Sequence, residues 1–168
     1  MSQEPTASRP DELPPYTHIP GITPHPISGP NGHMRDSADH VDIESREHQL
    51  SVGTHLFNLG FYWEAHEAWE HLWIALGRSG DDADIVKGLI KLAACGVKCL
   101  EANPTGAGRH ASRAAKLLNT AVAPDWFELN IRAACEIAVH AAEEPPVLKR
   151  ASDGKPQTLQ GFHLLTDQ

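Results

Sequence analysis

The chain has 168 residues and a formal net charge of −8 with neutral histidines; 40% of its residues are hydrophobic and 6% are aromatic. This length suits one compact domain with a buried core, and the alanine-rich, aromatic-poor composition favours packed helices over a strand-rich sandwich. The negative charge argues against a nucleic-acid partner, because an acidic surface repels phosphate.

The three cysteines, Cys95, Cys99 and Cys135, form no C-x-x-C pair. Their odd number and their spacing argue against a disulfide framework and against a structural zinc site. No apolar stretch approaches the ~20 residues that cross a bilayer, and the first residues show no signal peptide. These features predict a cytoplasmic protein that binds no membrane.

Residues 1–42 are rich in proline and histidine and lack apolar periodicity. Proline fixes φ and removes a backbone donor, so this segment cannot form a long helix. We predict an extended arm whose first dozen residues are disordered. Apolar residues recur along the middle of the arm, at Tyr16, Ile19, Ile22 and Ile27, which predicts that it lies along a surface of the protein.

From residue 43 to residue 144 the chain is predicted to be helical. Five helices are expected, over residues 43–59, 62–76, 81–102, 105–120 and 125–144. Gly60 and Gly77 are typical of positions just after a helix, Thr105 is expected to cap the fourth helix, and Asp125 with Glu128 forms a capping box for the fifth. The predicted fold class is all-α, a single compact bundle of about five helices with an extended Pro-rich N-terminal arm. Residues 145–168 are a C-terminal tail that packs back or hangs free.

The third helix is apolar on nearly every side, which predicts a central position in the bundle. Its polar exceptions, Lys87, Lys91 and Lys98, fall within about 40° of one another on a helix that turns ~100° per residue. Such a lysine stripe on an otherwise buried helix requires an acidic partner.

The second helix contains the segment FYWEAHEAWEHLW, residues 61–73, in which three glutamates and two histidines accompany three tryptophans. On a helix, Glu64 and His66 lie at the two edges of the apolar face. The charged side between them also carries Trp63 and Ile74. Apolar side chains on a charged side indicate that it is covered, by the arm or by the lysine stripe.

The spacing of His66 and Glu70, four residues apart, places both side chains on one face, close enough to bind one ion. Glu67 lies between them, as the general base does in the H-E-x-x-H zinc motif. A third ligand would come from His25 or His33 of the arm, or from His110 or His140.

Two other interpretations account for the same residues. Glu64 and Glu67 occupy the first turns of the helix, where the macrodipole favours negative charge, and His66 with Glu70 is an i, i+4 pair that supports an exposed helix. Alternatively, the cluster is a buried polar network that anchors the arm.

The stretch LFNLGFYWEAHEAWEHLW resembles the signature of the bacterial and archaeal domain-of-unknown-function 309 family, a phenylalanine-asparagine-x-glycine turn followed by an E-x-H-E-x-x-E-x-x-W helix. The matching positions are Phe57, Asn58, Gly60, Glu64, His66, Glu67, Glu70 and Trp73. A second family block, G-L-I-x-L-A, matches residues 88–93, and the arm matches a P-G-x-x-P-H-P pattern at residues 20–26. The resemblance covers roughly residues 14–120 and implies a compact all-α fold with no established activity. It also implies glutamine where this chain has Lys91, whose charge would neutralise a metal site.

The predicted site is a polar pocket beneath the arm. Its lining residues are Glu64, His66, Glu67, Glu70, Trp73 and Lys91. The leading function is a metal-dependent, hydrolase-like enzyme, with a divalent metal on His66, Glu70, His25 and His33 and with Glu67 as general base. The alternative is a non-catalytic binding or scaffold module, with self-association as a candidate interaction, in which the cluster is structural.

Overall fold

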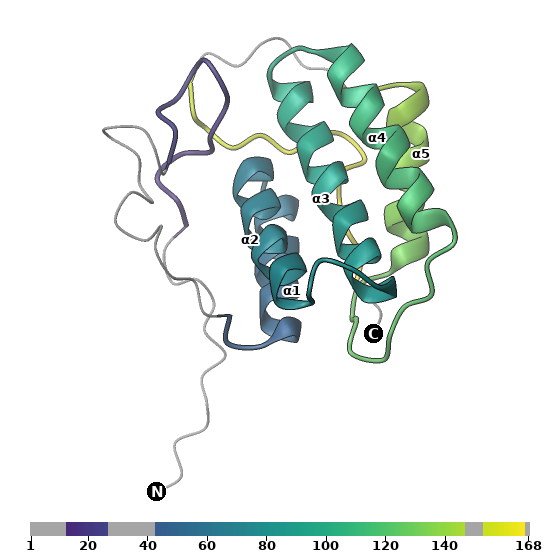
Figure 1. Ribbon diagram of the computed structural model, residues 1–168. Helices are drawn as coiled ribbons and strands as arrows, with labels where there is room; N and C mark the ends of the chain where they lie inside the picture. The colour runs from purple at the N-terminus through teal and green to yellow at the C-terminus, as the bar shows by residue number, and fades with distance from the viewer. Residues whose placement is uncertain (1–12, 27–42, 147–152, 167–168) are drawn as a thin grey trace, which may run out of the picture.

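The computed structural model describes residues 13–26, 43–146 and 153–166. It contains five helices: α1 (Arg46–Asn58), α2 (Tyr62–Ala75), α3 (Asp81–Leu100), α4 (Pro104–Asn119) and α5 (Ile131–Glu143) (Figure 1). In the described part of the chain, β pairing is limited to one isolated bridge between Leu129 and Thr166. The predicted all-α bundle of about five helices is confirmed.

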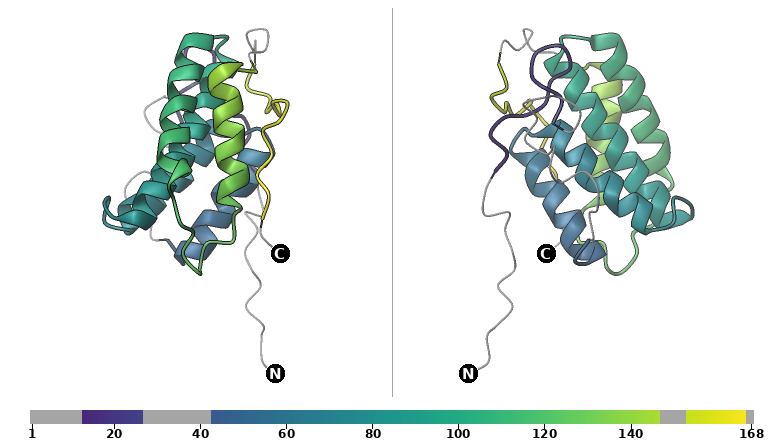
Figure 2. Two further views of the ribbon diagram at one scale, coloured as in Figure 1. Left: turned by 90° about the vertical axis from the view of Figure 1, so that its right-hand side faces the viewer. Right: turned by 60° about the vertical axis from the view of Figure 1, so that its left-hand side comes forward.

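Each helix packs against its neighbours in the chain, so that α3 lies between α2 and α4 (Figures 1 and 2). Two glycines bring the α3 backbone close to these neighbours. A Cβ atom at Gly96 would lie 2.5 Å from the ring of Tyr62 on α2, and one at Gly88 would lie 2.8 Å from the side chain of Leu118 on α4. The central position predicted for the third helix is therefore observed, and it depends on residues that have no side chain.

The glycine signals after α1 and α2 are confirmed. Gly60 has a φ of 88° and Gly77 a φ of 83°. The Gly60 N–H donates to Phe57 and the Phe61 N–H to Leu56, which is the paired hydrogen bonding of a Schellman motif. The end of α3 has the same geometry with a different residue, because Ala102 occupies the left-handed position with a φ of 56°.

The predicted starts of the fourth and fifth helices are wrong. Asn103, not Thr105, caps α4, and its side chain accepts a hydrogen bond from the Gly106 N–H. The α5 helix begins at Ile131, after Asn130, whose side chain accepts from the Ala133 N–H. The capping box expected at residues 125–128 does not form, because this segment turns and buries Phe127 in the core instead.

The C-terminal tail packs onto α1 and α2, and Figure 2 shows it also running beside α5. The Asn58 side chain donates to the Leu164 carbonyl and accepts from the Leu164 N–H. The Tyr62 hydroxyl accepts from the Leu159 N–H at 2.8 Å, and the ring of Phe162 stacks on Phe57 with centroids 5.8 Å apart. Of the two alternatives for the tail, packing against the bundle is the one observed.

Residues 13–26 of the arm also pack against the protein. Ile19 is fully buried, while Tyr16 and Ile22 are half-buried. The Thr17 N–H donates to the Gly154 carbonyl at 2.8 Å, which joins the arm to the tail. The prediction that the arm lies along a surface is confirmed for this segment. Ile27 and the first dozen residues lie outside the described residues.

All three cysteines are free, and Cys95 and Cys99 are buried. Within the described part of the chain, none of the helices combines the length and the apolar character that crossing a bilayer requires.

Candidate functional site

The N-terminal turn of α2 carries a buried carboxylate. Glu64 is only 4% exposed because the arm covers it. The Thr17 hydroxyl donates to one carboxylate oxygen and the His18 N–H donates to the other, each at 2.9 Å. Glu64 therefore ties the arm to the bundle, as expected for a buried polar network.

Burial raises the pKa of the Glu64 carboxyl to about 7. The hydrogen bonds from Thr17 and His18 favour the charged form and lower the pKa, but by less than burial raises it. The neighbouring charge of Glu67 raises the pKa further. A carboxyl group that changes charge near neutral pH thus lies at the contact between arm and helix.

The arm also covers Trp63, the tryptophan on the charged side of α2. The rings of His18, His25 and Trp63 contact one another edge to face, with centroids 5.1 to 5.5 Å apart. The ring of His25 lies in this aromatic cluster, and His25 is outside the group of side chains placed to share an ion. His33, the other predicted ligand of the arm, lies outside the described residues.

One turn further along α2, three side chains converge. His66 Nδ1 lies 3.4 Å from a carboxylate oxygen of Glu67 and 3.7 Å from one of Glu70. One ligand atom from each side chain lies within 4.8 Å of the others. The side chains of His66, Glu67 and Glu70 are 29%, 18% and 42% exposed, so solvent reaches the cluster, although His66 Nδ1 itself is buried and has no hydrogen-bond partner.

Lys91, predicted to line the pocket, is half-buried on α3, and none of the described acidic residues forms an ion pair with it. Its charge acts on His110 of α4, as does that of His66. Burial lowers the pKa of His110, and nearby positive charges lower it further. Lys91, Lys98 and Arg113 therefore lie close enough to His110 for their charges to act on its imidazole.

The other lysines of the stripe and Trp73 lie outside the cluster of His66, Glu67 and Glu70. Lys98 pairs with Glu101, the residue that directly follows α3, so its acidic partner does not come from α2. Lys87 is exposed to solvent. Trp73 is half-buried with an unpartnered indole nitrogen, and the guanidinium group of Arg78 lies 6.0 Å from its ring centroid.

Residues 50–110 match the family model described as Domain of unknown function (DUF309). Over this segment the chain is similar to the DUF309 family. This match confirms the resemblance inferred from the E-x-H-E-x-x-E-x-x-W segment, and it spans most of α1, all of α2 and α3, and the first part of α4. No curated protein matches the chain. The DUF309 segment contains His66, Glu67 and Glu70, whereas the parts of the arm and tail that pack on it lie outside it.

The structure divides the residues that were predicted to line one pocket. His66, Glu67 and Glu70 come together, while Glu64 lies beneath the arm. The donors to Glu64 were missed, because Thr17 and His18 are 47 and 46 residues away and no spacing rule connects them.

Proposed function

We propose that the DUF309-like segment of this chain binds a divalent metal ion through His66, Glu67 and Glu70, and that the bound ion supports hydrolase-like chemistry. The observation that carries the proposal is the convergence of three ligand atoms within 4.8 Å, one of them an unpartnered imidazole nitrogen. A buried nitrogen without a hydrogen bond is costly, and an ion would satisfy it.

The distances support this assignment. In a tetrahedral site with ligands at about 2.0–2.1 Å from zinc, two ligand atoms lie roughly 3.3–3.4 Å apart. The separations of 3.4 and 3.7 Å from His66 Nδ1 to Glu67 and Glu70 need only small side-chain rotations to meet that geometry. An imidazole and two carboxylates leave a coordination position open for water, as in catalytic sites.

His66, Glu67 and Glu70 would hold a divalent ion here, which would supply Lewis-acid activation of water near neutral pH. Glu67 has two roles in the proposal: one oxygen is the third ligand, and the other accepts a proton from the water. His25 is not needed as a ligand, because Glu67 takes that position. Lys91 and His66 both act electrostatically on His110, and the positive charge of Lys91 would favour a negatively charged substrate.

Elemental analysis and calorimetric titration of protein without a histidine tag test the metal site. One equivalent of Zn²⁺ or Mn²⁺ should bind per chain, and His66→Ala or Glu70→Gln should weaken binding about tenfold or more. His71→Ala is the matched control, because it removes an imidazole from the same helix outside the three-residue cluster. Equal binding by the control, the wild type and both ligand variants would refute the site.

The hydrolase step requires a separate assay. With the metal loaded, Glu67→Gln should lose turnover of activated ester and phosphate-ester substrates by about 10²-fold or more. The loss of turnover should exceed the loss of metal occupancy, which is measured on the same samples. Turnover in proportion to occupancy would remove the base role and leave a metal-binding protein.

A second function, a non-catalytic binding or scaffold module, is favoured by the burial of Glu64 under the arm. In that case His66, Glu67 and Glu70 form an ion-pair network when His66 is protonated. If the cluster is structural, His66→Ala should lower the free energy of unfolding even in the presence of a chelator. Titration of the wild type with Zn²⁺ should then release no heat. Sedimentation analysis would show whether the module self-associates.

A further inference from the structure

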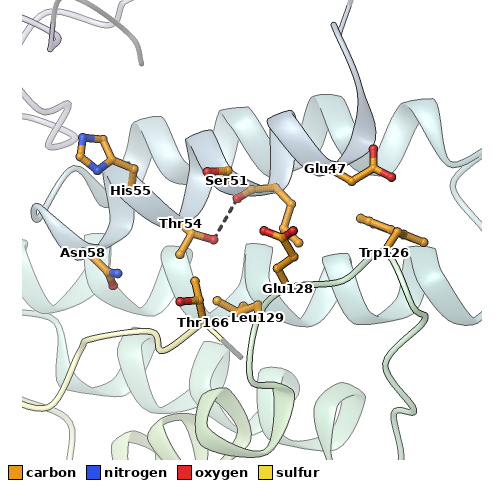
Figure 3. A pocket seen from close by; sticks show the side chains of 10 residues that line it. Glu47, Ser51, Thr54, His55, Asn58, Trp126, Glu128, Leu129 and Thr166 are labelled. Carbon is orange, nitrogen blue, oxygen red and sulfur yellow. Dashed lines mark hydrogen bonds between the residues drawn. The ribbon is translucent and has the colours of Figure 1, made fainter. Parts of the chain in front are cut away.

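A cavity of about 220 Å³ lies on the side of α1 that faces the α4–α5 connection (Figure 3). Its apolar surface comes from Leu50, Leu129 and the indole of Trp126. Figure 3 shows Glu47 and Trp126 at one end and Asn58 at the other. The volume is below the ~300 Å³ at which drug-sized sites begin, so the cavity suits a small metabolite.

The charge of the lining is of one sign. Glu47 and Glu128 are its carboxylates, and no lysine or arginine is among the lining residues. Glu128 lies between the two ends and faces α1 from the other side of the cavity (Figure 3). Among the described residues, Glu128 has no ion-pair partner, whereas Glu47 lies 3.4 Å from the guanidinium nitrogen of Arg46. His55 adds an imidazole to the lining, but the two carboxylates make the cavity more favourable to a cationic than to an anionic ligand.

The three hydroxyl groups of the lining can accept hydrogen bonds from a ligand. The Thr54 hydroxyl gives its hydrogen to the Leu50 carbonyl at 2.9 Å, so it faces other groups as an acceptor. Ser51 and Thr166 add hydroxyl oxygens at the same cavity. A ligand with several N–H groups would find carboxylate and hydroxyl acceptors together.

Trp126 is held in place by two contacts from residues outside the lining. Its indole N–H donates to Asp82 at 3.0 Å, and the guanidinium group of Arg46 lies 4.9 Å from its ring centroid. The guanidinium group of Arg46 lies beside this ring and beside Glu47, so the rim of the cavity already holds one cation. A fixed aromatic wall with carboxylates nearby is the arrangement that recognises ammonium groups.

We infer that this cavity binds a small organic ammonium ion, with the charged nitrogen at Glu128 and Glu47 and the apolar part against Leu50, Leu129 and Trp126. The inference is independent of the metal site, because α2 contributes no residue to the cavity.

Nuclear magnetic resonance provides a site-specific test. The indole N–H resonance of Trp126, assigned with Trp126→Phe, is followed during titration with butylammonium chloride, 1-butanol or sodium butyrate. Butylammonium should shift it saturably, with a Kd about tenfold or more below that of butanol, while butyrate should not bind. Glu128→Gln should weaken butylammonium binding about threefold or more, and Glu47→Gln should also weaken it.

Glu136→Gln is the matched control, because Glu136 is an exposed carboxylate on α5 outside this cavity. This control distinguishes binding of butylammonium in the cavity from the general attraction of cations to a chain of charge −8. The control should bind butylammonium like the wild type. Three results would each overturn the inference: no saturable shift at Trp126, equal affinity for butanol and butylammonium, or equal weakening by Glu136→Gln and Glu128→Gln. Glu47 and Glu128 are exposed, so the variants should unfold at wild-type urea concentrations.

Discussion

Replacing Glu64 by glutamine should remove a large pH-dependent term from the stability of the protein. The amide oxygen of the variant can still accept from the His18 N–H. The Thr17 hydroxyl can rotate and accept from the amide NH₂ instead of donating. Glu64→Gln therefore keeps the contacts between arm and helix and removes only the ability to become charged beneath the arm.

The magnitude follows from the pKa of Glu64, which burial raises from 4.5 to about 7 in the folded protein. Because this pKa is higher in the folded than in the unfolded state, the folded protein binds more protons between these two values. Its stability is then full below pH 4.5 and falls as the pH rises through 7. One pKa unit corresponds to about 1.36 kcal/mol, so the full effect is about 3 kcal/mol.

Urea unfolding at pH 4.5 to 8.5, with a chelator to keep both proteins free of metal, measures this effect. The difference in unfolding free energy between wild type and Glu64→Gln isolates Glu64, because groups such as His110, whose pKa is lowered and whose contribution has the opposite sign, are common to both proteins. The variant should gain about 3 kcal/mol relative to wild type across this range. A difference that stays constant with pH would refute the reasoning.

Three further substitutions test the packing, each by urea unfolding at fixed pH. Tyr62→Phe should cost about 1–3 kcal/mol, because the buried Leu159 N–H loses its acceptor; a cost near zero would mean that the tail does not depend on this bond. Ala102→Gly should stabilise the protein by about 0.5–1 kcal/mol, since it relieves a φ of 56°, and a destabilised variant would contradict the left-handed turn. Gly96→Ala should destabilise by about 1–3 kcal/mol, because its Cβ would lie 2.5 Å from the Tyr62 ring; wild-type stability would show that α2 and α3 can separate freely.

Local signals predicted most of the fold. Apolar periodicity with Gly60 and Gly77 located the first two helices to within a few residues, since a left-handed residue after a helix is specified locally. The capping box at residues 125–128 failed because a local motif competed with burial of Phe127, and burial prevailed. Local helix and capping propensities do not include the free energy gained when a side chain such as Phe127 is buried in the core.

The candidate site was predictable where it depends on helix geometry and not where it depends on distant segments. The convergence of His66 with Glu70 follows from their four-residue spacing on α2. The burial of Glu64 depends on where the arm docks, which is set by contacts across more than forty residues. The cavity beside α1 joins Glu47, Trp126 and Thr166, and no sequence pattern connects residues so far apart.

The route of the tail has a practical consequence for anyone who wishes to express or transplant this domain. The matched segment, residues 50–110, begins inside α1 and ends inside α4. A fragment cut at those positions would lose α5 and the ring of Phe162, which packs in the hydrophobic core. The apolar surfaces that they cover would then be exposed to water, which favours aggregation. The folded domain therefore extends beyond the matched segment at both ends. A fragment designed for expression should keep residues 13–166 together.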